Sequence, residues 1–342
     1  MKIVVLGFEG CLPSGIVGLS DIFWLAGRAA PGTTGAAAGP GSAAARPLAW
    51  DVITASINGR ALRDGRGRLQ PVDASVLDID DCDAVLVPGL VPGADGLPPR
   101  TDAMRRAGDW LRRRHAHGCL IGGSCAGVFV LGEAGLLDQR RCTTTWWLHE
   151  ALKSRYPRAD AVWGSALLET DRVVSAGGPM SWVDLALHTI SRLAGPAVAK
   201  SVADFAVIDN TSLTQAVYAP RRYLSERDPL LQRAEQAVRR APAGIGAGSL
   251  AHELSISERT LHRRLKALAG ESPKAFITRL RLEMALALLD GQGGSIKRVA
   301  EQCGYEDDGS FRRAFTRFAG MSPSAYRSWA LARARPAVPA GA

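Results

Sequence analysis

Apolar and polar positions alternate in two different ways along the chain. From residue 1 to about residue 215, short uninterrupted apolar runs are separated by segments of helical periodicity. Continuous apolar runs are typical of strands buried on both faces of a parallel sheet, so this part predicts an α/β sandwich. The expected strands are Ile3–Gly7, Trp50–Ala55, Ala84–Pro88 and Cys119–Gly122, and the expected helices are Thr101–His117, Ala126–Glu133 and Met180–Leu193.

The C-terminal third instead repeats a helical pattern at an offset of 50 residues. Residues 270–276 are GESPKAF and residues 320–326 are GMSPSAY. Upstream of each copy, three apolar residues spaced i, i+4, i+7 mark one face of a helix. They are Leu261, Leu265 and Leu268 in the first copy and Phe311, Phe315 and Phe318 in the second.

The other face of each repeated helix is basic and polar. Its residues are Arg259, His262, Arg263 and Lys266 in the first copy, and Gly309, Ser310, Arg312, Arg313, Thr316 and Arg317 in the second. A short helix precedes each, at residues 250–254 and 299–303, followed by a turn with Ser257 as N-cap or Gly304. This order predicts two helix-turn-helix motifs, whose second helices enter the DNA major groove. Two ordinary amphipathic helices are the plainer alternative, but the matched caps and Ser-Pro exits favour DNA binding.

The sequence also predicts two further helices in the C-terminal part and one long loop in the N-terminal part. A continuous helix from about Lys274 to Asp290 is expected to hold the two motifs at a fixed separation, and Asp228-Pro229 is expected to begin a helix through Arg240. The segment from Arg28 to Arg46 is rich in Ala, Gly, Pro, Ser and Thr, which is typical of a surface loop or flexible insertion.

The charge and the cysteines narrow the class of protein. The formal net charge is +9, and beyond residue 240 the chain has 15 Lys and Arg against 9 Asp and Glu. The basic excess therefore coincides with the expected DNA-binding part. Six cysteines show neither metal-ligand spacing nor a disulfide framework, so we expect no metal and no cofactor. The first apolar run is too short for a signal peptide and no stretch could span a membrane, so a reduced cytoplasmic protein is expected.

One segment of the first part contains a candidate reactive cysteine. Residues 120–127 are LIGGSCAG, an apolar strand running into a helix with small residues on both sides of Cys125. Such a turn is how a nucleophile elbow is built: it exposes the side chain and directs helix N-terminal amides at it. We therefore expect an exposed thiol with a lowered pKa.

Both parts resemble known families. The linker RLRLEMALALL at residues 279–289 and CGYEDDGSFRRAF at residues 303–315, followed by GMSP, resemble AraC-type transcription regulators. The elbow segment and GEAGLLD at residues 132–138 resemble PfpI-like members of the class I glutamine amidotransferase superfamily. Together with GGPMSWVDLALH at residues 177–188, the chain is similar to GlxA-type transcription regulators. The resemblance implies a PfpI-like, flavodoxin-like parallel-sheet sandwich followed by an all-α domain with two helix-turn-helix motifs.

The resemblance also indicates what the elbow lacks. Many relatives carry a His between a Thr-Thr pair and a Trp, where this chain has Thr145, and no carboxylate stands near Ser14-Gly15. An activated Cys needs a base, and His149, one helical turn after Thr145, is the residue that could substitute. We therefore expect no enzyme, with Cys125 as a vestigial elbow on the floor of a ligand pocket. The residues expected to line the pocket are Ser124, Cys125, Ala126, Thr145, Trp146 and Trp147.

Several alternatives and partners stay open. Cys125 could serve an amidase or aldehyde-processing hydrolase, or a thiol that senses oxidants or electrophiles, or the first domain could only dimerise. Expected partners are double-stranded DNA, a small-molecule inducer of unknown identity such as an amine or amino acid, RNA polymerase and a second copy in a homodimer, with no membrane. The expected domains are a sensing and dimerisation domain at 1–215, a linker at 216–227, a DNA-binding domain at 228–332 and a disordered tail at 333–342.

Overall fold

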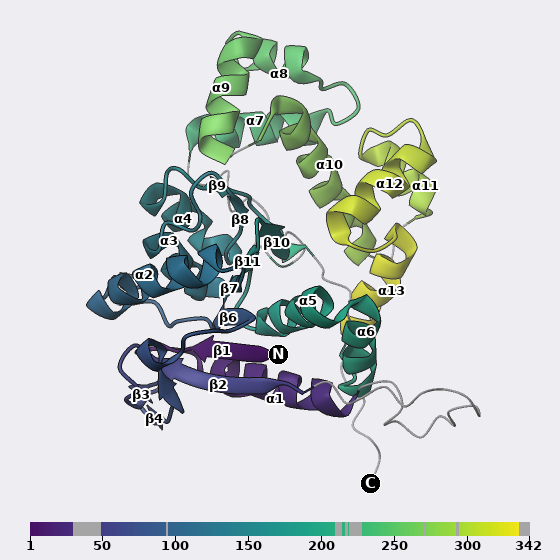
Figure 1. Cartoon of the computed structure of the whole chain (residues 1–342). Coiled ribbons are helices and arrows are strands. Elements are labelled where there is room, and N and C mark those ends of the chain that lie inside the picture. The colour runs from purple at the N-terminus through teal and green to yellow at the C-terminus, as the bar shows by residue number, and fades with distance from the viewer. Residues whose placement is uncertain are drawn as a thin grey trace, which may run out of the picture. The chain divides into compact units, whose positions relative to one another are not determined.

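The chain divides into two units, Met1–Ser212 and Leu213–Ala342, in the computed structural model (Figure 1). The structure describes residues 1–29, 49–93, 95–208, 214, 215, 218, 228–269, 271–291 and 294–334. Most of the insertion expected at Arg28–Arg46, most of the linker expected at 216–227 and the tail beyond Ala334 lie outside these residues. Within the described part, no helix combines the length and apolar character needed to span a membrane.

A seven-stranded sheet forms the centre of the first unit, in the order β10-β11-β7-β6-β1-β2-β5. Neighbouring strands are parallel except for β10 and β11. All residues of β6 and β7 are buried, and so are all those of β1 after Lys2, which confirms the buried parallel strands. The strands of this sheet are β1 (Lys2–Leu6), β2 (Asp51–Ser56), β5 (Ala74–Ser75), β6 (Ala84–Val87), β7 (Leu120–Ser124), β10 (Leu167–Thr170) and β11 (Val173–Ala176).

Helices cover both faces of this sheet (Figure 1). On one face, α1 packs on β1 and β2 and against α5 and α6. On the other face, α2 and α3 pack against β7 and against each other. Two small strand pairs, β3 with β4 and β8 with β9, lie outside the main sheet. The helices are α1 (Pro13–Arg28), α2 (Asp102–Ala116), α3 (Val128–Glu133), α4 (His149–Arg155), α5 (Trp182–Ala194) and α6 (Pro196–Phe205), and the small strands are β3 (Leu62–Arg63), β4 (Leu69–Gln70), β8 (Arg141–Cys142) and β9 (Asp160–Ala161).

The second unit is helical throughout its described secondary structure, and its helices reproduce the sequence repeat. Helix α12 begins 50 residues after α9, and α13 begins 50 residues after α10. Ser272 and Ser322 cap the starts of α10 and α13, each hydroxyl accepting a bond from the backbone N–H three residues later. The helices are α7 (Pro229–Arg240), α8 (Ala247–Glu253), α9 (Glu258–Ala269), α10 (Pro273–Asp290), α11 (Ile296–Gln302), α12 (Asp308–Ala319) and α13 (Pro323–Ala334).

The loop between α7 and α8 ties the two helix-turn-helix motifs together in addition to α10. The guanidinium of Arg281 on α10 donates hydrogen bonds to the carbonyl oxygens of Pro242 (2.8 Å) and Ile245 (3.0 Å). Gly304, in the turn of the second motif, lies so close to the same loop that a Cβ would stand 2.6 Å from the Pro242 carbonyl. Its φ of +79° also favours glycine.

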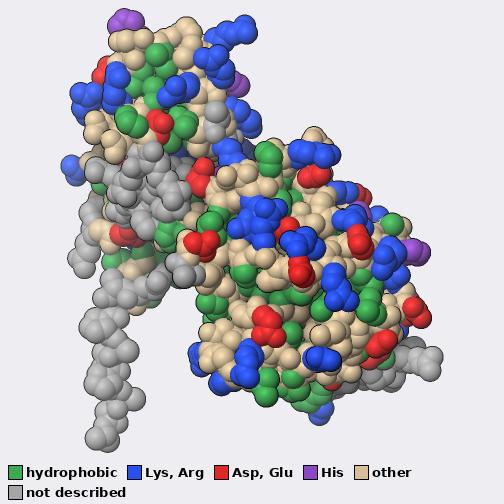
Figure 2. Space-filling model, turned by 90° about the vertical axis from the view of Figure 1, so that its left-hand side faces the viewer, with side chains coloured by type: hydrophobic (Ala, Val, Ile, Leu, Met, Phe, Trp, Pro, Cys, Tyr) green, Lys and Arg blue, Asp and Glu red, His purple; other side chains and the backbone are tan. Residues whose placement is uncertain are grey.

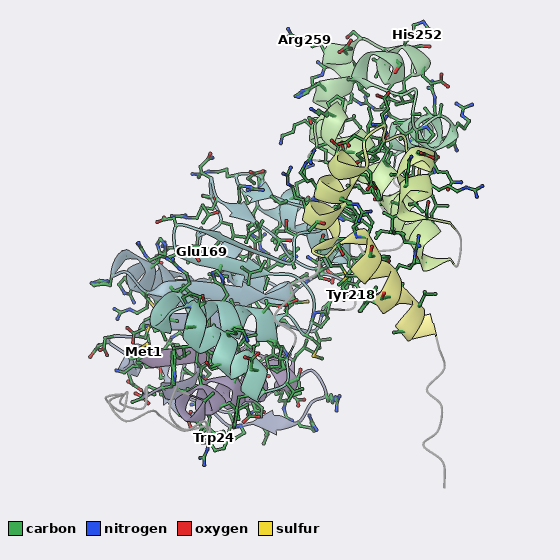
Figure 3. The ribbon with its side chains drawn as sticks, turned by 90° about the vertical axis from the view of Figure 1, so that its right-hand side faces the viewer. Met1, Trp24, Glu169, Tyr218, His252 and Arg259 are labelled. Carbon is green, nitrogen blue, oxygen red and sulfur yellow. The ribbon has the colours of Figure 1, made fainter. Side chains whose placement is uncertain are left out.

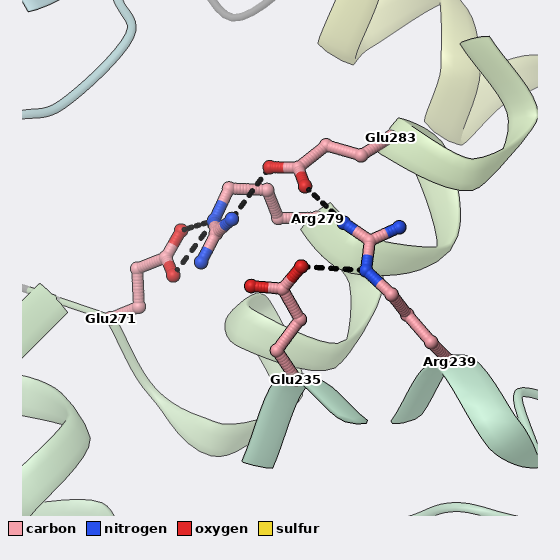
Figure 4. A network of polar contacts seen from close by, with 5 residues as sticks. All are labelled: Glu235, Arg239, Glu271, Arg279 and Glu283. Carbon is pink, nitrogen blue, oxygen red and sulfur yellow. Dashed lines mark hydrogen bonds and ion pairs between the residues drawn. The ribbon is translucent and has the colours of Figure 1, made fainter. Parts of the chain in front are cut away.

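A network of five buried or half-buried charged residues joins α7, α10 and the loop after α9 (Figure 4). Arg279 donates to Glu271 (3.0 Å) and Glu283 (2.6 Å), and Arg239 donates to Glu283 (3.2 Å) and Glu235 (2.6 Å). Burial raises the pKa of Glu271, against the opposing attraction of Arg279. Three carboxylates share two guanidinium groups here, so each cation is needed to keep its neighbours ionised.

We predict that Arg279→Met lowers the free energy of unfolding of the helical unit by about 3–5 kcal/mol, because Glu271 loses its cation inside the protein and Glu283 keeps only Arg239. Arg240→Met is the matched control, since its ion pair with Glu253 is exposed and should contribute less than about 1 kcal/mol. Urea unfolding of the full chain, with hydrogen exchange of α10 peptides to assign the transition, measures both. Equal losses in the two variants would contradict a structural role for the network.

Candidate functional site

Helix α9 presents a buried face and a solvent-facing basic face. Leu261 and Leu265 are fully buried, whereas Arg259, His262, Arg263 and Lys266 are exposed. Among the described residues, Arg259, His262 and Arg263 form no hydrogen bond or ion pair, so their donors are available to an outside partner. Arg259 points outward from the helical unit (Figure 3), and Lys and Arg side chains stand out over the part of this unit visible in Figure 2.

Helix α12 has the same two faces but a different charge balance. Phe311 and Phe315 are fully buried, and Ser310, Arg312, Arg313, Thr316 and Arg317 are exposed, with Gly309 partly so. Arg312 donates to Asp308 (2.7 Å), and Arg313 donates to the Ser310 hydroxyl (3.0 Å) and lies 3.8 Å from Asp307. Arg312 and Arg313 are therefore partly neutralised within their own helix, whereas Arg259 and Arg263 on α9 are not.

Side chains cap the starts of both helices, by Ser257 as expected from the sequence and by Asp307, which was not expected from it. The Ser257 hydroxyl accepts a bond from Thr260 N (3.2 Å), and Asp307 accepts from Gly309 N (3.2 Å) and Ser310 N (2.6 Å). These contacts fix the first turn of each helix. The Asp307 carboxylate has a pKa below its usual range, chiefly because of its bonds from Ser310.

The elbow in the first unit has the backbone conformation of a nucleophile turn. Cys125 follows β7 with a φ of +52°, a left-handed conformation that is strained for a residue with a side chain. Its surroundings hold it closely: Thr144 Oγ1 donates to the Cys125 carbonyl (2.8 Å), and a Cβ on Gly127 would stand 2.5 Å from the carbonyl oxygens of Val87 and Pro88. The sequence correctly located the turn.

The expected exposure and acidity of the thiol are wrong. Cys125 is 4% exposed, and burial raises its pKa to about 11, although the N–H of Ala126 acts in the opposite direction. The desolvation of a buried thiolate outweighs the one backbone hydrogen bond, from Ala126, that stabilises the charge. Cys125 is therefore a protonated thiol at neutral pH.

The candidate base, His149, does not reach the thiol. No hydrogen bond joins Cys125 to His149 in the described part of the chain, and the nearest ionisable partner of His149 is Glu150, with Nε2 3.7 Å from Oε1. His149 is 2% exposed, and burial, assisted by Lys153, lowers its pKa to about 4. The structure therefore lacks the hydrogen bond between base and thiol through which a catalytic cysteine is normally activated.

Buried polar atoms without partners occur around this segment. Ser124 Oγ, Thr145 Oγ1 and both ring nitrogens of His149 are buried and accept or donate no hydrogen bond within the described residues. An unsatisfied buried group costs about 1–3 kcal/mol, so a group of them suggests a partner outside the chain. Thr145 directly follows Thr144, whose hydroxyl donates to the Cys125 carbonyl, so the Thr143–Thr145 segment is attached to the elbow at this bond.

Trp146 and Trp147 follow in the same segment, in a short 3-10 turn at Trp146–Leu148. Their rings meet edge to face with centroids 5.0 Å apart. Trp146 is half-buried and Trp147 is 38% exposed, so one ring is directed inward and the other remains accessible. Sequence reasoning included these residues but missed the burial of His149, because only the fold places its helix against the core.

The sequence matches two protein families. Residues 38–192 match the DJ-1/PfpI family, and residues 250–328 match a family described as a helix-turn-helix domain. The two matched segments fall in the two units that the structure separates.

Individual transcription regulators are similar to the chain over different lengths. The chain is 29% identical over 296 residues to the HTH-type transcriptional regulator CdhR of Pseudomonas aeruginosa, covering 86% of this chain and 85% of CdhR. It is 27% identical over 220 residues to the HTH-type transcriptional regulator GlxA of Rhizobium meliloti, covering 64% of this chain and 68% of GlxA. A crystal structure of an AraC family transcriptional regulator from Pseudomonas putida is similar with 19% identity and a TM-score of 0.48, covering 60% of this chain and 98% of that one.

We predict that His149 makes the first unit sensitive to mild acid. Its pKa is about 4 in the folded chain and about 6.5 when unfolded. The contribution of neutral His149 to the free energy of unfolding is therefore fully present above pH 6.5. As the pH falls from 6.5 toward 4, the unfolded chain binds a proton that the folded chain excludes, and this contribution is lost. The loss between pH 7 and pH 4.5 should be roughly 2–3 kcal/mol.

Urea unfolding of wild type and His149→Gln at both pH values tests this prediction, because the variant should lose less stability on acidification. His117→Gln, which removes a ring from the surface, is the control. Identical pH dependence in wild type and His149→Gln would contradict the assignment.

Proposed function

The chain combines a DJ-1/PfpI domain with an AraC-type helix-turn-helix domain in a DNA-binding transcription regulator, and we propose that α9 and α12 are its recognition helices. The observation that carries the assignment is the doubled helix with a buried apolar face and an exposed basic face. Contacts to bases are assigned to Arg259, His262, Arg263, Lys266, Gly309, Ser310, Arg312, Arg313, Thr316 and Arg317.

The two recognition helices are proposed to contribute unequally. Arg263 and Arg313 occupy the same place in the repeat, but only Arg313 has partners, Ser310 and Asp307. Arg313 must give up these contacts before it can bind a guanine edge, whereas Arg263 has none to lose. The first helix should therefore supply more of the affinity.

We propose that the first domain is a small-molecule sensor without catalytic activity. The protonated thiol and the absence of a bonded base support this over an amidase or hydrolase that uses Cys125, and the raised pKa also disfavours Cys125 as an oxidant or electrophile sensor. The unpartnered Ser124, Thr145 and His149 favour a ligand that both donates and accepts hydrogen bonds. The exposed face of Trp147 is compatible with an amine or amino acid. We also propose that the protein forms a homodimer and that it contacts RNA polymerase.

Arg263→Ala should weaken binding to the preferred DNA site by about 1–3 kcal/mol and relax the base preference in one half of that site, because a bidentate guanine contact is lost. Arg313→Ala should relax the other half with a smaller loss of affinity. The site is first selected from random duplexes with wild-type protein, and affinities are then measured by fluorescence anisotropy.

Arg158→Ala is the control, because this exposed arginine lies in the first unit and pairs with Asp138. The affinity of wild type should also fall steeply with salt. Unchanged site preference in both Arg263→Ala and Arg313→Ala would show that these helices do not read DNA bases.

Thr145→Val should leave the protein as stable as wild type or up to about 2 kcal/mol more stable, since it removes a buried hydroxyl that has no partner. Thr143→Val is the matched control: its hydroxyl is equally buried but donates to the Ser165 carbonyl (3.0 Å), so its loss should destabilise by about 1 kcal/mol. Thermal unfolding measures both. Both variants should bind DNA as wild type does.

The sensor proposal predicts that Thr145→Val and Cys125→Ser weaken the response to the inducer, scored as reporter transcription from the selected site across a panel of amines and amino acids. An unchanged response in both variants would argue against a ligand at the elbow. Steady turnover of amide or aldehyde substrates that Cys125→Ser abolishes would instead establish an enzyme.

A further inference from the structure

Two cysteines outside the elbow lie in direct contact. Cys82 Sγ and Cys119 Sγ are 3.4 Å apart, and both are reduced. Cys82 precedes β6 and Cys119 precedes β7, and these neighbouring parallel strands are locked in register where Leu120 N donates to the Asp83 carbonyl (3.0 Å). The elbow cysteine follows the opposite end of β7, so the Cys82–Cys119 pair is a separate site.

The two thiols differ in access and acidity. Cys119 is 3% exposed, whereas Cys82 is half-buried and can be reached from solvent. A hydrogen bond from Cys119 lowers the pKa of Cys82, with help from the Arg114 guanidinium and against the effect of burial. The same bond and burial raise the pKa of Cys119. Access to solvent and the nearby Arg114 favour Cys82 as the thiol that reacts first.

The charged neighbours of Cys82 are arranged to tolerate a thiolate. Arg114 Nε is buried and has no hydrogen-bond partner among the described residues, so one guanidinium nitrogen remains to be satisfied. The two nearby carboxylates, which oppose a thiolate, are engaged elsewhere: Asp81 with Lys2 Nζ (2.5 Å) and Asp83 with Lys2 N (2.6 Å). None of the other four cysteines has a second thiol in such contact within the described part of the chain.

We propose that Cys82 and Cys119 form a reversible disulfide when the protein meets hydrogen peroxide. The Cys82 thiolate attacks one peroxide oxygen, an S–O bond forms as the O–O bond breaks, and the leaving hydroxide takes a proton to become water. The Cys119 sulfur then attacks the sulfenic sulfur of Cys82. The S–S bond forms, the hydroxyl leaves, and with the Cys119 proton it becomes a second water. Two thiols are oxidised and one peroxide is reduced to two waters.

The geometry requires little movement. The sulfur atoms must approach from 3.4 Å to about 2.0 Å, the length of a disulfide bond. Both cysteines lie just before their strands, so the shift falls on the connecting segments and leaves the paired residues of β6 and β7 in place. This inference does not depend on the proposed DNA contacts or on a ligand at the elbow.

Brief treatment of the full chain with hydrogen peroxide, followed by denaturation and alkylation, tests the site. Wild type should carry two fewer alkyl groups than the reduced protein, and peptide mapping should find one cross-linked pair containing Cys82 and Cys119 that a reductant separates. If both cysteines stay alkylated, or if Cys125 is oxidised while they are not, the proposal is overturned.

Three variants identify the roles of the two sulfurs. Cys82→Ser should form no cross-link and should leave Cys119 reduced, because the accessible nucleophile is gone. Cys119→Ser should stop at a sulfenic acid on Cys82, detected with dimedone. Cys142→Ser, which removes a buried cysteine elsewhere, should cross-link as wild type does. A dimedone adduct on Cys119 in Cys82→Ser would reverse the assigned order and overturn it.

Discussion

Helix α10 belongs to two hydrophobic cores at once, and the arrangement of the helical unit depends on this constraint. Phe276, Ile277 and Leu280 pack with α7, α8 and α9, while Leu282 to Leu289, farther along the same helix, pack with α11, α12 and α13. A helix whose first half lies in one core and whose second half lies in another cannot rotate or slide without disrupting the packing of at least one core. The two basic helices are therefore held by one rigid element, as reading successive parts of a DNA site requires.

The sequence allowed the helical unit to be predicted closely because its signals are local. An i, i+4, i+7 pattern, a Ser or Asp cap and a Ser-Pro start each act within one or two helical turns, and the repeat shows each of them twice. The elbow was located for the same reason: a buried strand followed by small residues leaves few other conformations. The central strands were found because they are buried on both faces and hence continuously apolar.

What the sequence could not show depends on contacts between distant segments. Cys82 and Cys119 meet only because β6 and β7 are neighbours, and Arg279 is buried only because Glu271 and Glu283 surround it. By local pattern, Arg279 would be assigned to a solvated face. Helix α1 was missed because glycines at positions 15 and 18 weaken its signal, although both are needed where Pro88 and Trp182 pack closely against it. The acidity expected for Cys125 failed because burial is a property of the fold.

The elbow has the backbone conformation of a nucleophile turn, but its thiol has a raised pKa. Its left-handed Cys125 persists although the strain costs roughly 1–3 kcal/mol, because Gly127 and the Thr144 bond leave the chain no relaxed alternative. In a cysteine enzyme such strain holds a reactive sulfur beside a base, whereas here burial raises the pKa of Cys125 and lowers that of His149, and no hydrogen bond joins the two among the described residues. The strained turn directly follows Ser124, and the Thr144 bond attaches the segment before Thr145 to it. The turn therefore holds in place the backbone that carries the unpartnered hydroxyls of Ser124 and Thr145. The sensor function proposed above would use this turn to hold a ligand that supplies the missing hydrogen bonds.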